Sequence, residues 1–402
     1  MRIITLLFII ALFFNITGCS KSEQPGNNSP KSVWKTPLLE GKESFTLSPI
    51  IYKDLVIYGS KYALLDHNEK LKILAFNKHT GEKTWEWNEV QSLYETLSAS
   101  NDIYINGNIL TFSTGARVYA IDMDTGKSLW MTKEPDQGLN NIVGIGNTVY
   151  HVRASIDKKR DVLLKADISN GNWVSVFVAE QQSKLSLIKN RMLLYKDNDG
   201  ENYLYFTYSH TDLQYTSSEI HLVKLNVRTD SIIFNRILSD NQAYSITAIN
   251  DKGIYLAGGA LKCFSKNTGE FIKAYDLPVS RQNYTSGQCI IHGNKLFAPT
   301  DFPKLICYDI DSGNTLWSED GLSTSLPSRL IYHDGIIYYT SSSDGFLHAI
   351  DENGKRYWKF QSPDRKGSGN GIFDSVISID AAENRIYVSS YYNALCYETI
   401  KK

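Results

Sequence analysis

Short runs rich in Tyr, Val, Ile and Phe, bounded by Gly, Asn, Asp or Ser, recur along the chain. Examples are GIIYYTS at 335–341 and NRIYVSS at 384–390. β-branched and aromatic residues in such runs favour strands, whereas helical repeats would show an apolar period of about 3.6 residues. The pattern predicts an all-β protein.

One phrase recurs in seven segments: a strand, a turn whose Gly allows positive φ, and a second strand that carries an aromatic residue. The clear copies are AFNKHTGEKTW (75–85), AIDMDTGKSLW (120–130), CYDIDSGNTLW (307–317) and AIDENGKRYW (349–358), and weaker copies lie at 165–175, 224–234 and 263–273. The turn residues are Gly81, Gly126, Gly171, Asp230, Gly269, Gly313 and Gly354, at steps of 45, 45, 59, 39, 44 and 41 residues. A period of about 40 to 45 residues with strand content is typical of the four-stranded blade of a β-propeller.

The chain ends supply an eighth blade. NALCYETI at 393–400 resembles the strand that precedes a turn, but the chain stops before the strand that should carry the Trp. SVWKTPL at 32–38 supplies that strand, with Trp34 in the place of Trp85. We therefore expect an eight-bladed propeller of four-stranded antiparallel blades, closed by N- and C-terminal strands that share one blade, which removes open sheet edges between the ends of the ring.

The composition is consistent with one large propeller over residues 32–402. Hydrophobic residues make up 42% of the 402 residues and charged residues only 21%. No blade can bury both its faces alone, so packing between blades should be the main source of stability.

The N-terminus is expected to be a targeting segment. Arg2 precedes an apolar run at 3–16 that is too short for a spanning helix, and Ile16-Thr17-Gly18-Cys19 follows. This tetrapeptide resembles the bacterial lipobox, which implies a lipoprotein signal peptide at 1–18 and a lipid on Cys19. An ordinary secretory signal is the alternative.

Residues 19–31 are then the lipidated Cys and a polar, flexible tether. In the lipoproteins that this segment resembles, a Ser after the lipidated Cys implies transport to the outer membrane, and retention in the inner membrane is the alternative. The implied location is the bacterial cell envelope, with the protein anchored by lipid and facing the periplasm.

Charge and cysteine content exclude some functions. The formal net charge is −1, without a basic cluster, so we expect no nucleic-acid partner. Cys263, Cys307 and Cys396 occupy equivalent places in different blades, too far apart for a disulfide, and Cys289 has no obvious partner. No CxxC, HxH or HExxH spacing indicates a metal site.

The A-x-D-x-x-T-G-x-x-x-W phrase resembles the repeat of the pyrroloquinoline quinone type β-propellers, over essentially all of residues 32–402. One branch of these proteins consists of quinoprotein dehydrogenases, and the other of smaller lipoproteins similar to BamB, a subunit of the machinery that assembles outer-membrane β-barrels. A lipobox, a short tether and a chain near 400 residues resemble the second branch. The resemblance implies a non-catalytic scaffold without cofactor or metal, whose partner is an outer-membrane assembly protein or another envelope protein.

Two alternatives remain open. A dehydrogenase of this type uses a calcium-bound quinone, for which Asp301 or Asp374 are conceivable calcium ligands, but the chain has no Cys-Cys dipeptide and is shorter than those enzymes. A ligand-sensing surface lipoprotein is the other alternative. The repeated Asp122, Asp309, Asp351 and Asn77 are expected to bind turn N–H groups, because a catalytic residue would be needed once rather than in every blade.

Two segments could form a partner surface. The longest step between turns contains an insertion at 196–219 with Tyr203, Tyr205, Phe206 and Tyr208, expected to form an extended hairpin on blade four. Its aromatic residues could instead pack the enlarged blade. The second segment is the loop at 362–374, with Arg365 and Lys366 before three glycines, which could equally be a solvated connection.

Overall fold

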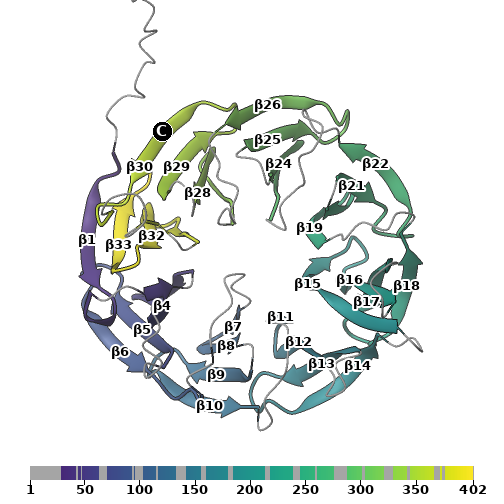
Figure 1. Cartoon of the computed structure of the whole chain (residues 1–402), viewed down its shortest axis with the longest axis horizontal. Helices are drawn as coiled ribbons and strands as arrows, with labels where there is room; N and C mark the ends of the chain where they lie inside the picture. The colour runs from purple at the N-terminus through teal and green to yellow at the C-terminus, as the bar shows by residue number, and fades with distance from the viewer. Residues whose placement is uncertain are drawn as a thin grey trace, which may run out of the picture.

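The structure is a computed structural model. It describes residues 29–41, 44–46, 48–62, 70–92, 95, 103–114, 116–132, 142–154, 160–179, 184–212, 218–238, 245–258, 260–275, 288–300, 304–320, 329–341, 345–365, 372–373 and 376–401. Within these ranges the strands form eight antiparallel sheets that follow one another around a ring (Figure 1). The chain is an eight-bladed β-propeller, which confirms the fold predicted from the sequence.

Each blade has four strands, numbered here from the centre of the ring outward. The first strands are β3 (Ile50–Tyr52), β7 (Ile103–Asn106), β11 (Ile142–Ile145), β15 (Lys184–Lys196), β19 (Ser245–Asn250), β23 (Ile290–His292), β27 (Ile331–His333) and β31 (Ser378–Asp380). The second strands are β4 (Leu55–Tyr62), β8 (Ile109–Ser113), β12 (Thr148–Ala154), β16 (Asn202–Asp212), β20 (Gly253–Ala257), β24 (Lys295–Pro299), β28 (Ile336–Thr340) and β32 (Arg385–Ser389).

The third strands and the outer strands carry the repeated phrase. The third strands are β5 (Lys72–Asn77), β9 (Val118–Asp122), β13 (Asp161–Asp167), β17 (Ser218–Asn226), β21 (Leu261–Phe264), β25 (Lys304–Asp309), β29 (Phe346–Asp351) and β33 (Asn393–Glu398). The outer strands are β6 (Lys83–Trp87), β10 (Lys127–Met131), β14 (Trp173–Val178), β18 (Ile232–Ile237), β22 (Phe271–Tyr275), β26 (Thr315–Asp320), β30 (Arg356–Gln361) and β1 (Ser32–Pro37). A short strand β2 (Ser44–Thr46) also pairs with β4, and a 3-10 turn, η1 (Leu39–Gly41), follows β1.

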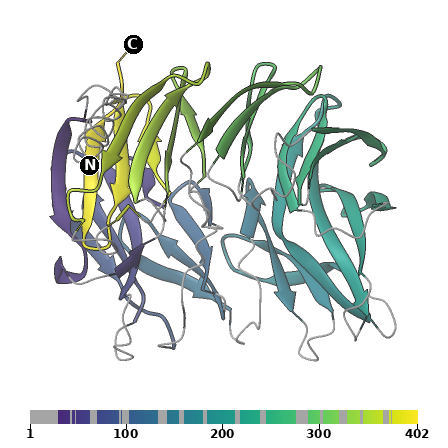
Figure 2. The same cartoon turned by 45° about the horizontal axis from the view of Figure 1, so that its top comes forward.

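Blade eight joins the two ends of the chain. Strand β1 pairs with β33, with Trp34 opposite Cys396 and Thr36 opposite Ala394. In Figure 2 the purple strand β1 lies against the yellow strands of this blade. Main-chain hydrogen bonds therefore close the ring, as the repeat count predicts.

The turns of the phrase have the expected local structure. Gly81, Gly126 and Gly354 have φ of 75°, 70° and 87°, and Asp230 takes the same left-handed conformation with φ of 56°. Carboxylate or amide oxygens accept from turn N–H groups: Asp122 Oδ1 accepts from Thr125 N at 2.8 Å. The equivalent acceptors are Asn77, Asp309 and Asp351. The structural interpretation of these repeated residues is confirmed.

Four of the phrase Trp residues fasten their blades to the turn of the next blade. Trp34 Nε1 donates to the carbonyl of Lys78 at 2.8 Å, and a Cβ on Gly81 would lie 2.8 Å from the Trp34 ring. Trp85, Trp130 and Trp317 donate to the following blade in the same way. A turn Gly is thus required twice, for its positive φ and for the close approach of an indole.

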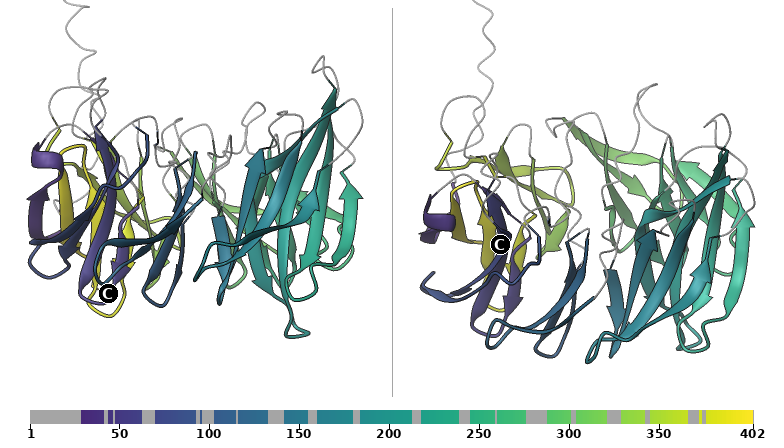
Figure 3. Two further views of the ribbon diagram at one scale, coloured as in Figure 1. Left: turned by 90° about the horizontal axis from the view of Figure 1, so that it is seen from below. Right: turned by 60° about the horizontal axis from the view of Figure 1, so that its bottom comes forward.

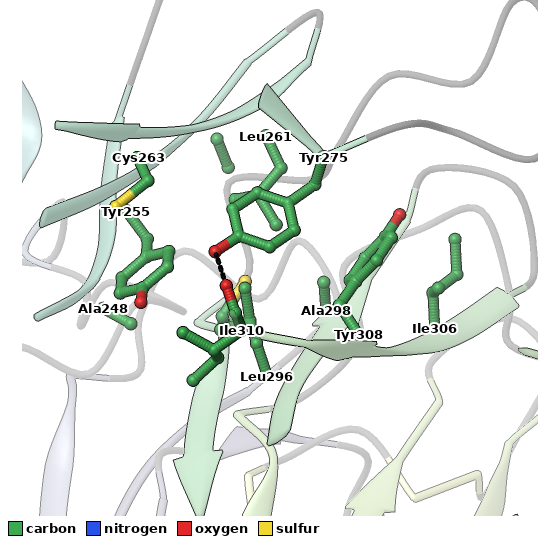
Figure 4. Close-up of a cluster of buried hydrophobic side chains, with 12 residues drawn as sticks. Ala248, Tyr255, Leu261, Cys263, Tyr275, Leu296, Ala298, Ile306, Tyr308 and Ile310 are labelled. Carbon is green, nitrogen blue, oxygen red and sulfur yellow. Dashed lines mark hydrogen bonds between the residues drawn. The ribbon is translucent and has the colours of Figure 1, made fainter. Parts of the chain in front are cut away.

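The hydrophobic core lies between blades. Figure 4 shows one cluster, in which Tyr275 of blade five lies beside Tyr308 of blade six, at a ring distance of 5.4 Å. The Tyr275 hydroxyl donates to the carbonyl of Ile310 at 3.3 Å. Cys263 and Cys289 belong to this cluster, and all four described cysteines are free, as the spacing predicts.

Candidate partner surface

Blade four is longer than its neighbours. Strands β15, β16 and β17 have 13, 11 and 9 residues, whereas β11 and β19 have 4 and 6. In Figure 3 the teal strands of this blade reach beyond the ends of the other strands. The insertion at 196–219 therefore lengthens existing strands of the ring.

The aromatic residues of this insertion do not form a surface. Tyr203, Tyr205, Phe206 and Tyr208 are at most 7% exposed. Phe206 and Tyr208 pack against Phe177 of blade three, and the two other rings belong to the core between blades four and five. Because both faces of β16 are covered by neighbouring blades, the prediction that these four residues contact a partner is wrong. Their burial supports the alternative that they pack the enlarged blade.

A buried ionic cluster joins blades four and five. Asp197, in the turn after β15, accepts from Lys266 at 2.5 Å and from Lys224 at 3.1 Å. Lys266 also pairs with Asp251 at 3.2 Å, and the Tyr195 hydroxyl donates to the Asp251 carboxylate at 2.7 Å. The side chains of Asp197 and both lysines are at most 8% exposed.

The lysines determine the charge state of Asp197. Burial alone would raise its pKa, but hydrogen bonds from Lys266, from the Asn198 N–H and from Lys224 outweigh burial and lower the pKa to about 2. The carboxylate is therefore ionised and saturated with donors, and the cluster has a structural role. The sequence contains one signal for it: Lys224 stands in the phrase where Ala75 stands in blade one, and a charge at a small, buried place needs a buried partner.

The loop after β30 is tied to the closing blade. The Asp364 carboxylate accepts from Asn393 at 2.7 Å and also from Ser390 and Lys35. These donors hold the pKa of Asp364 below its usual value against the opposing effect of burial. Arg365 lies over the ring of Phe346, 5.5 Å from its centre, and remains a candidate for partner contact.

Other predicted site residues lie outside the described residues. Lys366, Asp301 and Asp374 are among them, and so is Cys19. Their proposed roles stay predictions.

The outer rim of the ring is not uniform. Register places a Trp opposite the third strand in blades one, two, six, seven and eight: Trp85, Trp130, Trp317, Trp358 and Trp34. Val174, Phe234 and Lys273 occupy this place in blades three, four and five. Three of the eight blades therefore lack a Trp at this place.

Polar contacts replace the missing indoles. Lys165 of blade three pairs with Asp230 of blade four at 2.8 Å. Arg236 of blade four donates to the carbonyl of Thr268 at 3.0 Å, and Lys273 of blade five donates to the carbonyl of Ile310. In blade four the ring of Phe234 also packs on the next turn, because a Cβ on Gly269 would lie 2.8 Å from it.

The described residues contain little that indicates catalysis. They contain no group of three His, Cys, Asp or Glu that could hold a metal ion. Burial raises the pKa of Cys263 and Cys289 to about 11, and that of Cys307 and Cys396 to about 12. Ser186 Oγ lies 2.7 Å from His210 Nδ1, but Ser186 is 0% exposed, so a substrate would reach it only if blades three and four separated.

Within the described ranges no helix is long and apolar enough to cross a membrane.

The sequence profile of the family described as outer membrane protein assembly factor BamB matches residues 27–209 and 257–390. Residues 210–256 lie between the two matched ranges. No curated protein sequence matches the chain significantly.

Solved structures share the fold. BamB from Moraxella catarrhalis is 15% identical, with a TM-score of 0.59 over 92% of this chain and 100% of that chain. Quinohemoprotein alcohol dehydrogenase from Comamonas testosteroni is 11% identical, with a TM-score of 0.66 over 92% of this chain and 77% of that chain. The computationally designed Ika8 protein is 15% identical, with a TM-score of 0.62 over 92% of this chain and 99% of that chain. At these identities the likeness shows the fold alone.

Proposed function

Since the chain belongs to the family described as outer membrane protein assembly factor BamB, we propose that it is a non-catalytic scaffold that binds proteins during the assembly of outer membrane proteins. The observation that carries the proposal is the family match to both halves of the ring. A rigid ring whose rim differs from blade to blade suits a scaffold, because it can present different surfaces to different partners.

The proposed scaffold is anchored by lipid. Residues 1–18 would be a lipoprotein signal peptide, Cys19 the lipidated residue, and residues 19–31 a tether to the propeller at 32–402. The Ser after Cys19 supports placement on the outer membrane, facing the periplasm.

The resemblance of the fold to quinoprotein dehydrogenases is the reason to keep an enzymatic alternative. Catalysis by such an enzyme requires a quinone and a metal held by converging carboxylates. In the described residues the repeated carboxylates bind turns, and Asp197 and Asp364 are occupied by lysines. These contacts support the scaffold over the enzyme.

Affinity purification from membranes tests the scaffold role. Tagged protein extracted in mild detergent should retain a protein of the outer-membrane assembly machinery in a stoichiometric complex, detected by mass spectrometry. A tagged, unrelated lipoprotein of the same membrane is the control. Absence of assembly proteins, together with a quinone absorbance after supply of pyrroloquinoline quinone and calcium, would contradict the scaffold and favour the dehydrogenase.

The anchor has its own prediction. Cys19→Ala removes the thiol that would accept the lipid, so the protein should move from the membrane fraction to the soluble fraction while its circular dichroism spectrum stays that of the propeller. Cys263→Ala is the matched control, because this thiol is buried in the ring and its loss should leave the protein on the membrane. Lipid labelling that persists in Cys19→Ala would contradict the assignment.

A further inference from the structure

Exposed apolar side chains gather on the outer strands. Among the described residues, eleven large apolar side chains are exposed, and ten of them lie on outer strands: Leu129, Met131, Val174, Val178, Ile232, Ile233, Ile237, Phe271, Ile272 and Leu316. They belong to blades two to six, and none lies on β1, β6 or β30.

Part of this exposure comes from the repeat itself. Leu129, Ile233, Ile272 and Leu316 are each the extra residue of a β-bulge that precedes the Trp place of the outer strand. A bulged residue pairs with no residue of the neighbouring strand, so its exposure follows from the local backbone of the repeat. These four residues therefore say nothing specific about a partner.

Three of the remaining residues lie on the faces that blades three and four turn toward each other. Val174 pairs with Lys165, whose Nζ binds Asp230 of blade four, so Val174 lies on the face toward blade four. Ile232 pairs with Leu225, which belongs to the core shared with blade three.

Ile237 lies on the same face as Ile232. It pairs with His221, which stacks on Tyr208, and Tyr208 contacts Phe177 of blade three. Val174, Ile232 and Ile237, here called the rim strip, are 57%, 43% and 61% exposed.

The rim strip lies where other junctions carry an indole. Val174 occupies the Trp place of blade three, whereas Trp34 and Trp358 in that place are only 8% and 6% exposed. Trp173, next to Val174, packs on Trp130 of blade two and on His151 of its own blade. The apolar strip is therefore uncovered within the described chain.

The edge of β18 is also open to pairing. Within the described chain, β18 pairs only with β17, so alternate N–H and C=O groups of β18 point away from the blade. Outer strands usually carry charges that discourage pairing, as β30 does with Arg356 and Lys359. The one charged residue of β18, Arg236, is bound toward blade five, and β14 has no charged residue.

We infer that the rim strip and the free edge of β18 bind an extended segment of a partner protein, which pairs with β18 as an added strand of blade four. Apolar side chains of this segment cover Ile232 and Ile237 along β18 and Val174 on the facing blade, where Val174 occupies the place of an indole. The occupant is an extended strand with alternating apolar residues, the pattern of outer-membrane β-barrel strands. This inference rests on the proposed scaffold function. Strand β18 lies in residues 210–256, outside the family match, whereas Val174 lies inside it.

Binding of a defined peptide tests the site. The probe is a fluorescent ten-residue peptide in which valine alternates with threonine, and anisotropy is measured with the purified full chain in detergent. The double variant Ile232→Lys/Ile237→Lys should bind at least tenfold more weakly than the wild type. The matched control Leu129→Lys/Leu316→Lys changes residues that are 47% and 49% exposed on bulges of other outer strands, and should bind as the wild type does.

A second probe separates strand pairing from simple apolar adhesion. The same peptide with N-methyl groups on alternate residues keeps its side chains but loses half of its N–H donors, so it should not bind. Equal binding of the methylated peptide, or equal weakening by both double variants, would overturn the inference. Unchanged thermal unfolding of both variants shows that the ring is intact.

Sedimentation distinguishes a second copy of the chain as occupant. If the wild type self-associates and the Ile232→Lys/Ile237→Lys variant does not, the occupant is a second copy of this chain, and the inference of a different partner protein is wrong. If the peptide does not bind while assembly proteins still copurify, the proposed binding site is wrong and the proposed scaffold function stands. If no assembly protein copurifies with the wild type, the proposed scaffold function is wrong, whether or not the peptide binds.

Discussion

Trp34→Ala lowers the free energy of unfolding by about 3–5 kcal/mol, as expected for truncation of a buried aromatic residue. Trp34 is 8% exposed although it lies on an outer strand near the start of the described chain. Its ring packs on Gly81 and lies 6.0 Å from the ring of Tyr387, and its Nε1 donates to the carbonyl of Lys78. The substitution opens a cavity at the junction that closes the ring and removes the shorter of two hydrogen bonds to that carbonyl, which keeps the Tyr387 hydroxyl as donor at 3.3 Å.

Urea unfolding followed by circular dichroism measures the loss. Phe271→Ala is the matched control, because Phe271 is an aromatic residue of an outer strand but is 55% exposed, so its truncation should cost far less. If Trp34→Ala and Phe271→Ala had equal midpoints, the indole would not fasten blade eight to blade one. A biphasic transition in Trp34→Ala alone would still support this role, since blades at the opened ends would unfold first.

The architecture could be predicted because the repeat encodes it locally. The turn at Gly126 needs its positive φ, Asp122 four residues earlier binds the turn N–H groups, and Trp130 four residues later reaches the next blade. All three features lie within one hairpin, so sequence spacing fixes their geometry. The missing Trp strand at the C-terminus then identified the strand at 32–38 as its complement.

The surface could not be predicted in the same way. A Tyr-rich strand in an insertion gives no indication of whether neighbouring blades cover both its faces, and in blade four they do. The rim strip depends on strand register. Counting four residues from the turn at Gly171 predicts that Ser175 occupies the Trp place. The bulge of β14 comes later along the strand than the bulge of β10, so Val174 occupies that place instead. Burial and register are properties of the assembled ring.

Contacts between residues that lie far apart in the sequence could not be predicted from the sequence either. The Arg365 loop looked like a solvated connection or a binding loop, and the structure ties its Asp364 to Lys35 from the other end of the chain. Asp197 and Lys266 are separated by 69 residues, and only the adjacency of blades four and five brings them together.

Asp197→Ala is expected to cost about 3–5 kcal/mol, because it leaves the buried ammonium group of Lys224 without its carboxylate and that of Lys266 with Asp251 alone. Glu201→Ala is the matched control in the same turn, since Glu201 pairs with Arg228, whose side chain is 70% exposed, and exposed ion pairs contribute little. Urea unfolding of both variants measures the difference. If the charges are the cause, replacing both lysines with Met in the Asp197→Ala background should recover much of the loss, because matched apolar residues need no partner.

The pH dependence of Asp197 gives an independent test. Its pKa is lowered to about 2 in the folded chain, below that of an unfolded Asp at about 3.9, so the ionised carboxylate stabilises the fold above pH 4. This stabilisation is lost as the pH falls from about 4 toward 2, because the unfolded chain takes up the proton first. Asp197→Asn, which cannot titrate, should therefore lose less stability than the wild type over this interval while being less stable at pH 7. Parallel stability curves for the two proteins between pH 4 and pH 2 would show that Asp197 is not the group held ionised between the two lysines.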